Sequence, residues 1–373
     1  MSRSLAPDCL LIGGGVIGLS LAWELARQGL RVQIVDQAET GQEASWAGAG
    51  ILPPANRQTA LHPYDQLRGL SMELHPQWAE ALGALTGIDT GYRVSGGIYL
   101  ARTAGETAAL AGWAGTVEDE QIPIHKLSFS ELAELEPGLA APGQPYRAIY
   151  QLPTEAQLRN PRYLKALKRA CELAGVEILP GFTVIAPLCE GDTLRAVETT
   201  GGVLSAGAFC FTAGAWTGRM LAEMGIPTGI LPMRGQMLLF RCETAPFRSI
   251  VNEGPRYLVP RDDGHVLVGA TEEEVGFDKR TTPEALRELH ELACDIVPQL
   301  KLAVLERSWA GLRPASFDGF PYLGPLPGLR NAYVASGHFR SGLYLSPGTA
   351  VVMRQLICGQ PLEIDLAPFR VGR

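Results

Sequence analysis

The stretch Cys9-Leu10-Leu11-Ile12-Gly13-Gly14-Gly15-Val16-Ile17-Gly18, followed by a helix-like segment and Arg31-Val32-Gln33-Ile34-Val35-Asp36, decides the fold. Residues 9–12 are apolar and indicate a short buried strand, and the three glycines predict a tight turn. Apolar residues then recur at helical spacing until Gly29, which predicts a helix that ends there. Residues 31–35 indicate a second strand that ends at Asp36. The stretch therefore predicts a complete β-α-β unit.

The glycines of this unit have the spacing GxGxxG. Gly13 permits the tight turn, Gly15 lets the backbone approach a pyrophosphate, and Gly18 lets the helix pack closely on the sheet. The phosphate would lie at the helix N-terminus, where free N–H groups favour an anion. Asp36 has the position of an acid that binds a ribose hydroxyl, which makes NADP the least favoured nucleotide. We predict a dinucleotide site here, and the motif alone does not separate FAD from NAD.

Working outward, hydrophobic periodicity predicts several further elements. The expected helices cover residues 64–85, 162–174 and 283–296, and the expected strands cover 92–100, 176–179, 236–240, 256–260 and 265–268. Segments typical of a nucleotide-binding domain occur at the start, middle and end of the chain, with strand-rich segments between them. We therefore expect an α/β fold, α+β overall, with two discontinuous domains.

Composition and charge limit the classes of function. The 373 residues are 46% hydrophobic and 19% charged, which is typical of a soluble globular protein with room for two domains. The formal net charge is −7 with scattered Lys and Arg, so nucleic acid and membranes are not expected partners. The seven cysteines form no CxxC pair, which argues against a metal site and a disulfide framework. With no export signal or apolar span, the expected location is the cytoplasm.

Three further segments resemble motifs of the D-amino-acid oxidase superfamily of FAD-dependent amine oxidases. Ser45-Trp46-Ala47-Gly48-Ala49-Gly50-Ile51 resembles the segment that lies along the flavin in that family. Phe211-Thr212-Ala213-Gly214-Ala215-Trp216 is similar to its strand-to-helix turn near the cofactor, and Pro232-Met233-Arg234-Gly235-Gln236 to its Pro-x-Arg-Gly-Gln element. Small residues are what close backbone approach to a flat ring requires.

The C-terminal part is similar to the glycine oxidase branch of this family. The matching segments are Ala310–Pro314, Asp318–Pro321 and the Gly-His-aromatic-Arg-x-Gly motif at Gly337–Gly342. The resemblance spans nearly the whole chain. It implies a Rossmann-like FAD-binding domain of the glutathione-reductase-2 type and a discontinuous substrate domain built on an antiparallel sheet. We expect the FAD-binding domain at 1–86, 146–221 and 306–373, and the substrate-binding domain at 87–145 and 222–305.

The resemblance also assigns roles to single residues. Arg313 matches the arginine that grips the substrate carboxylate, for which a planar guanidinium is the natural bidentate partner. Tyr257 matches the tyrosine that helps to hold it, and Arg340 the second active-site arginine beside the flavin. Ile51 departs from the methionine that is frequent in this branch. The expected cofactor-binding residues are Gly13, Gly15, Val16, Ile17, Gly18, Asp36, Ser45, Gly48, Ala49, Gly50, Ile51, Val184, Thr212, Ala213, Gly214, Trp216, Gly311, Arg313, Gly337, His338, Phe339, Arg340, Ser341 and Gly342.

Each role has a structural alternative. An arginine in a glycine-rich segment is usually a surface charge, and a tyrosine on a strand usually belongs to the core. His338 is expected to be structural, because a lone histidine is more often structural than a general base. Trp46 and Trp216 are expected to pack near the cofactor. No cysteine lies near Arg313 or in Gly337–Gly342, so the FAD is expected to be non-covalent.

The activity that the resemblance implies is oxidation of a small amino acid, glycine first, by hydride transfer to flavin N5 without a dedicated side-chain base. The products would be an imine or 2-oxo acid, ammonia and hydrogen peroxide. A role in thiamine synthesis and a tetramer are expectations from the lineage alone. The sequence leaves open a sarcosine or D-amino-acid oxidase, a dehydrogenase with another electron acceptor, a non-catalytic flavin-binding module and an NAD-dependent dehydrogenase.

Overall fold

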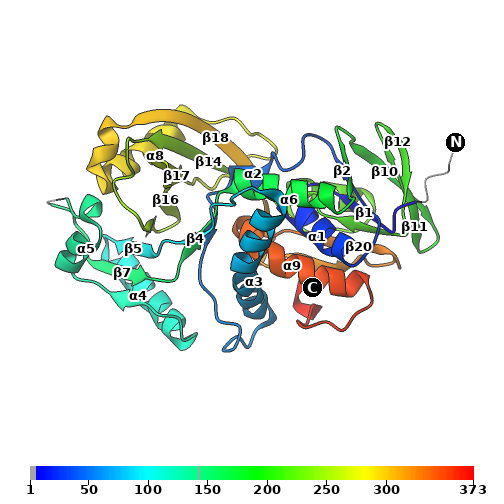
Figure 1. Ribbon diagram of the computed structural model, residues 1–373, viewed down its shortest axis with the longest axis horizontal. Helices are drawn as coiled ribbons and strands as arrows, with labels where there is room; N and C mark the ends of the chain where they lie inside the picture. The colour runs from blue at the N-terminus through cyan, green and yellow to red at the C-terminus, as the bar shows by residue number, and fades with distance from the viewer. Residues whose placement is uncertain (1–5, 142) are drawn as a thin grey trace.

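A six-stranded sheet has the predicted first strand at its centre. The computed structural model describes residues 6–141 and 143–373. The strand order is β19 (Tyr322–Pro325), β20 (Ala332–Ser336), β13 (Ala208–Phe211), β1 (Cys9–Ile12), β2 (Val32–Asp36) and β9 (Glu177–Pro180). All neighbours are parallel except β19 and β20. Segments from the beginning, middle and end of the chain thus lie side by side (Figure 1).

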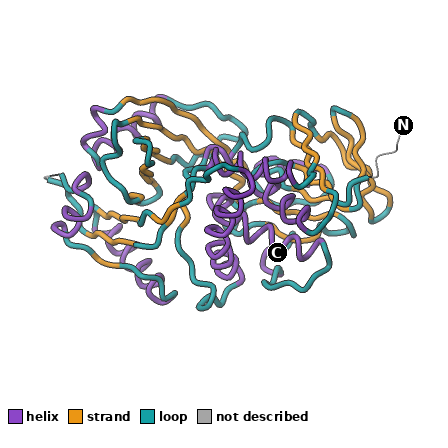
Figure 2. The backbone as a smooth tube through the Cα atoms, viewed as in Figure 1, coloured by secondary structure: helices purple, strands orange, loops and turns teal. Residues whose placement is uncertain are grey.

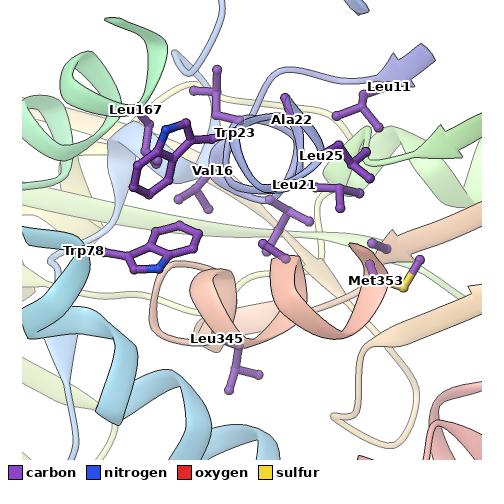
Figure 3. Close-up of a cluster of buried hydrophobic side chains, with 14 of the residues drawn as sticks. Leu11, Val16, Leu21, Ala22, Trp23, Leu25, Trp78, Leu167, Leu345 and Met353 are labelled. Atoms are coloured by element: carbon purple, nitrogen blue, oxygen red, sulfur yellow. The ribbon is translucent and has the colours of Figure 1, made fainter. Parts of the chain in front are cut away.

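Both faces of this sheet are covered, because the side chains of a strand alternate between its faces. Cys9 and Leu11 belong to the core shared with the helices α1 (Val16–Arg27), α3 (Pro63–Thr86), α6 (Asn160–Leu173) and α9 (Gly342–Ile357). Figure 3 shows this core, in which Trp23 meets Trp78 edge-on at 4.8 Å between ring centroids. Leu10 and Ile12 face the other core, which includes residues of β10 (Val184–Glu190), β11 (Thr193–Thr199), β12 (Gly202–Ser205) and α7 (Thr217–Glu223).

The second large sheet has eight strands. Its order is β18 (Val304–Ala315), β14 (Leu231–Arg241), β17 (His265–Gly269), β16 (Arg256–Pro260), β15 (Ile250–Glu253), β5 (Gly97–Ala101), β7 (Ala148–Leu152) and β6 (His125–Lys126). Only the β15–β5 pair is parallel. The helices α4 (Ala104–Asp119), α5 (Phe129–Leu135) and α8 (Pro283–Ile296) lie with this sheet, away from the first one (Figures 1 and 2).

Short elements join the two parts. A small sheet has the order β3 (Ile51–Leu52), β8 (Ala156–Gln157) and β4 (Arg93–Val94). The one-turn helix α2 (Ala44–Ala47) precedes β3. Short 3₁₀ helices cover Pro137–Leu139, Gly214–Trp216, Pro298–Leu302, Phe339–Ser341 and Ala367–Phe369.

The structure confirms the expected fold class and most of the predicted elements, and β1, β16 and α8 have their predicted bounds. The helix α4 was not predicted. Gly105, Gly112 and Gly115 lower its helix propensity. A capping box of Thr103 and Glu106 nevertheless starts it, which satisfies two backbone donors. The C-terminal segment, for which hydrophobic periodicity predicted no helix or strand, forms β19, β20 and α9.

Two strands differ from the expected domain division. Residues 146–152 and 306–315 were expected in the FAD-binding domain, but β7 pairs with β5 and β18 pairs with β14 in the eight-stranded sheet. Strand partners far apart in sequence leave no local pattern that would show this pairing. The division into two domains stays a proposal, and we move these two strands to the substrate-binding part.

The described residues also limit other kinds of site. No helix among residues 6–141 and 143–373 is long and apolar enough to cross a bilayer. Within the same residues, no cluster of three or more His, Cys, Asp or Glu is arranged to hold a metal. The seven cysteines are all free thiols. Burial raises the pKa of Cys9 to about 12, so its thiolate is disfavoured.

Candidate cofactor and substrate site

One continuous cavity of about 860 Å³ reaches from the six-stranded to the eight-stranded sheet. At one end Ile12, Asp36 and Thr212 line it, at the carboxyl ends of β1, β2 and β13. Ligands of open parallel α/β sheets bind at this edge. At the other end it is lined by Tyr257 and Arg313, which lie on β16 and β18.

The glycine turn before α1 requires glycine for two different reasons. Gly13 has φ +112°, and a Cβ there would meet the Thr212 carbonyl oxygen at 2.6 Å. Gly18 is not on the cavity wall, and its Cβ would lie 2.0 Å from the Gly13 carbonyl oxygen. Gly18 therefore lets α1 pack against the turn, whereas Gly13 and Gly15 line the cavity.

Asp36 lies beside this turn. Its carboxylate accepts hydrogen bonds from the Gly14 and Ala38 N–H groups at 2.8 and 3.1 Å. Burial raises the pKa of Asp36 from its ordinary value. Since a carboxylate has about four acceptor positions, it retains capacity for ribose hydroxyls. Ser45 supports the same turn, because its Oγ accepts from the Val16 N–H at 2.9 Å.

The loop Gly48–Ile51 is held from behind by a buried arginine. Arg261, 4% exposed, donates to the Ala49 carbonyl oxygen at 2.6 Å and to Gln157 Oε1 at 2.7 Å. Gly50 has φ +75°, and a Cβ there would lie 2.1 Å from the Leu158 carbonyl oxygen. The loop thus presents backbone to the cavity. Sequence analysis missed Arg261, although it follows directly on the predicted strand 256–260.

These features fit FAD. Backbone of Gly15, Gly48 and Gly311 lines the cavity without side chains, and α1 offers its N-terminus to an anion. Asn160 lines the same cavity, donates to the Ser45 carbonyl oxygen at 2.7 Å, and its buried Oδ1 has no hydrogen-bond partner among the described residues. This acceptor is available to a donor of a bound group.

The structure brings the expected cofactor residues together with two exceptions. All of them line the cavity except Gly18 and Gly337. Gly337 has φ +79°, so its backbone conformation accounts for the glycine. Trp216 lines the cavity and stacks at a tilt on Phe277, and Trp46 packs edge-on against Trp309, as packing residues would.

At the substrate end, strand register aligns Met237, Gly269, Tyr257, Asn252 and Tyr99 in one row across β14, β17, β16, β15 and β5. Aligned partners point to the same face of a sheet. The Tyr257 hydroxyl lies 3.5 Å from Met237 Sδ. A Cβ on Gly269 would meet both of these side chains, so the glycine lets Tyr257 lean toward Met237.

Arg313 is half-buried and lacks an acidic partner. Its guanidinium passes over Gly235, where a Cβ would lie 2.3 Å from Nη2, and its Nη1 donates to the Thr271 carbonyl oxygen at 3.0 Å. No carboxylate oxygen of residues 6–141 or 143–373 forms a salt bridge with it. The remaining donors are available to an anion in the cavity, and a carboxylate suits their planar geometry.

Arg340 and His338 differ from Arg313. Arg340 lines the cavity but is exposed, donates to the Pro255 carbonyl oxygen at 2.8 Å, and has an ion pair with Glu272 at 3.8 Å. His338 is buried, with Nε2 3.1 Å from Thr349 Oγ1. Burial lowers the pKa of His338 to about 3, so it is neutral near pH 7. This supports the structural role expected for His338.

Sequence analysis also missed a polar group at the substrate end. Glu155 is fully buried, lines the cavity, and accepts from the Tyr99 hydroxyl at 2.8 Å and from Asn252 Nδ2 at 3.4 Å. Burial raises the pKa of Glu155 to about 7. No local signal marks this glutamate, because its two partners come from strands distant in sequence.

The comparisons with known proteins agree with this geometry. A family model described as FAD dependent oxidoreductase (DAO) matches residues 8–356. A glycine oxidase of Pseudomonas putida is 37% identical over 366 residues, covering 98% of each chain. A bifunctional ThiO/ThiG protein of Nostoc is 31% identical over 99% of this chain and 55% of its own length. The crystal structure of glycine oxidase from Geobacillus kaustophilus superposes with a TM-score of 0.93 at 32% identity, covering 99% of each chain.

The match to the family model, the full-length relatives and the fit of the cavity identify the cofactor as FAD and the protein as an enzyme. The NAD-dependent dehydrogenase left open by the glycine motif is thereby set aside. The chain belongs to the DAO family of FAD-dependent oxidoreductases.

Proposed function

We propose that the protein oxidatively deaminates small amino acids, with glycine the first candidate and sarcosine and small D-amino acids next. The observation that carries this proposal is the half-buried Arg313 at the substrate end of the cavity, with donors that no acid of the described chain neutralises. The similarity to glycine oxidases supports the choice of substrate.

The chain's own residues hold and orient the substrate. In this proposal Arg313 binds the carboxylate, and Tyr257, which also lines the cavity, donates its hydroxyl to the same group. Met237 and Ile51 are apolar residues on the same cavity wall. Fixing the carboxylate on one side orients the α-carbon, and such orientation is a large source of rate acceleration. When bound, FAD would supply the two-electron acceptor for the hydride of that carbon.

Several finer points belong to the same proposal. The FAD is non-covalent, since none of the free cysteines is on the wall of the cavity in the described chain. The similarity to ThiO/ThiG proteins supports a supply of imine to thiamine synthesis. Oxygen as the electron acceptor, a cytoplasmic location and a homotetramer complete the proposal.

The test is anaerobic titration of the purified protein with glycine, sarcosine and D-alanine while the flavin spectrum is recorded. We expect glycine to bleach the absorbance near 450 nm and air to restore it with formation of peroxide. Bleaching without peroxide would replace the oxidase by a dehydrogenase. A spectrum unchanged by all three amino acids would refute catalysis on this class of substrate and favour a flavin-binding module.

A further inference from the structure

The described residues place a buried carboxyl group on the wall of the cavity, at the end that also holds Tyr257. Glu155 lies directly before β8, and its Oε2 occupies the space that a side chain on Gly97 would fill, 1.7 Å from the ideal Cβ position. Its backbone carbonyl accepts from the Ser95 and Gly96 N–H groups at 3.1 and 2.9 Å. The absence of a side chain at Gly97 therefore makes room for this carboxyl, and the two backbone hydrogen bonds fix the position of Glu155.

The Tyr99 hydroxyl connects this carboxyl to the cavity. The Tyr99 ring is fixed against Trp113, with 4.3 Å between centroids, and its hydroxyl donates to Glu155 Oε1 at 2.8 Å. Both residues line the cavity, but Glu155 is 0% exposed while Tyr99 is partly exposed. Of the two residues, Tyr99 is therefore the more accessible from the cavity.

The position of this pair relative to Tyr257 fits the amine of a bound amino acid. Tyr257, Asn252 and Tyr99 are successive members of the aligned row. Tyr257 leans toward Met237, and Asn252 and Tyr99 also line the cavity. For an amino acid whose carboxylate is bound by Arg313 and Tyr257, Asn252 and Tyr99 are the other polar side chains of this row that an amine can meet.

We propose that Glu155, acting through the Tyr99 hydroxyl, takes up the proton that the substrate ammonium group must lose before it is oxidised. The inference rests on the proposed function, since it assumes an amino-acid substrate. In the step, one N–H bond of the ammonium breaks as its proton bonds to the Tyr99 oxygen. The tyrosine's own proton passes to Glu155 Oε1. The amine becomes neutral, the tyrosine stays neutral and the carboxylate becomes a carboxylic acid.

The surroundings of Glu155 suit this task near neutral pH. Burial raises its pKa to about 7, and the Tyr99 and Asn252 hydrogen bonds oppose that rise only in part. From β5 the only titratable group facing it is Tyr99, from β15 it is met by the neutral Asn252, and no Lys, Arg or His of the described chain forms a salt bridge with it. A base with a pKa near the working pH is the effective choice for proton transfer.

The test compares wild type, Glu155→Gln and Tyr99→Phe by anaerobic rapid mixing with glycine from pH 6 to pH 10. The quantity compared is the reduction efficiency, which is the rate constant of flavin reduction divided by the substrate dissociation constant. In the wild type it should rise through about pH 7 as Glu155 ionises. In both variants this rise of the reduction efficiency with pH should disappear. At pH 8 the efficiency should be about 10- to 100-fold lower than in the wild type. The loss should shrink toward the pH at which free glycine deprotonates in solution.

Glu136→Gln is the matched control. Glu136 is also a buried glutamate, accepting from the Ser249 N–H at 2.8 Å and the Ser249 hydroxyl at 2.6 Å, but it is not on the cavity wall. This variant should keep the wild-type pH profile. FAD content and thermal unfolding identify any variant that fails to fold, and Tyr99→Phe then stands as the test because it retains Glu155.

The outcomes separate the two proposals. A Glu155→Gln or Tyr99→Phe profile that runs parallel to the wild type at every pH would overturn the proton-acceptor role and leave a structural one. Wild-type flavin that no amino acid reduces would instead refute the proposed function, on which this inference depends.

Discussion

At the scale of single residues, Arg313 is set apart by what surrounds it. Arg234 is buried with Glu273 as its partner, and Arg68 has Asp65 and Glu120 at 2.9 and 3.3 Å. Within residues 6–141 and 143–373, Arg313 donates only to a neutral carbonyl, so its charge is available to a ligand. A half-buried cation without an acidic partner has a desolvation penalty in the ligand-free protein. A bound carboxylate offsets this penalty by pairing with the cation.

Replacing Arg313 with Ala should therefore raise the KM for glycine about 100-fold or more, since losing one partner of a buried charge pair costs roughly 2–5 kcal/mol. Steady-state kinetics measure this effect. Arg307→Ala, an exposed arginine on the same strand, is the control and should keep the wild-type KM. A near-normal KM in Arg313→Ala would show that the carboxylate is held elsewhere.

A second residue-scale effect concerns stability in acid. His75 is 1% exposed, its Nε2 lies 2.8 Å from the Tyr344 carbonyl oxygen, and burial lowers its pKa to about 4. The unfolded chain takes up this proton below about pH 6.5. The contribution of His75 to the free energy of unfolding is therefore complete above pH 6.5 and is lost as the pH falls toward 4.

Between pH 7 and pH 5 this loss should reach about 2 kcal/mol, and His75→Gln should remove it from the pH dependence. Urea unfolding at the two pH values gives the difference. His125→Gln, at an exposed position of β6, should leave the drop unchanged. Equal drops in wild type and His75→Gln would contradict the assignment.

At the scale of elements, α1 depends on the close contact at Gly18. Gly18→Ala would place a Cβ 2.0 Å from the Gly13 carbonyl oxygen, so α1 must move away from the turn that lines the cavity. We expect most of the bound FAD to be lost and the unfolding temperature to fall. The ratio of absorbance at 450 to 280 nm reports the FAD content.

The other end of the same helix supplies the control. Gly29 has φ +83°, but a Cβ there meets nothing within 4 Å, so Gly29→Ala costs only backbone strain of about 1–2 kcal/mol. This variant should retain full FAD content. If Gly18→Ala also retains full FAD content, the close contact is not what shapes the site.

The elements also show what the sequence could predict. The unit β1–α1–β2 follows from periodicity and glycine spacing because all its determinants are local. The membership of β7 and β18 in the eight-stranded sheet does not, because it depends on pairs such as Tyr99 with Tyr150 and Gly235 with Gly311. Glu155 and Arg261 were missed for the same reason: only the folded chain brings their partners to them.

At the scale of the whole molecule, two sheets share one cavity. The nucleotide end is lined by residues that follow β1, β2 and β13, and the other end by residues of β14, β16 and β18. A ligand that fills the whole cavity therefore links both parts, whereas one that fills only the nucleotide end does not.

Removing the FAD should lower the unfolding temperature, and adding FAD back should restore it. At a concentration of 100 times its dissociation constant, a ligand of the native state stabilises it by about 2.7 kcal/mol. At matched saturation, ADP should narrow the unfolding transition less than FAD does, because it leaves the eight-stranded sheet uncontacted. Differential scanning calorimetry measures both. Identical transitions with ADP and FAD would argue against the link between the sheets.

The place of β1 in the sheet has a consequence for biosynthesis. On one side β1 pairs with β13, which in turn pairs with β20, and both of these strands are synthesised much later than β1. The helix α1 packs on α9, which lies near the C-terminus. Until α9 has been synthesised, the part of the apolar face of α1 that packs on α9 stays uncovered, although α6 is already available to its other contacts. The buried residues Leu21 and Leu25 can therefore reach their final packing only after residues 342–357 have been synthesised. Until then we expect chaperones to bind this apolar surface. A ribosome that stalls before that point would release a product for proteolysis instead of a partly working enzyme.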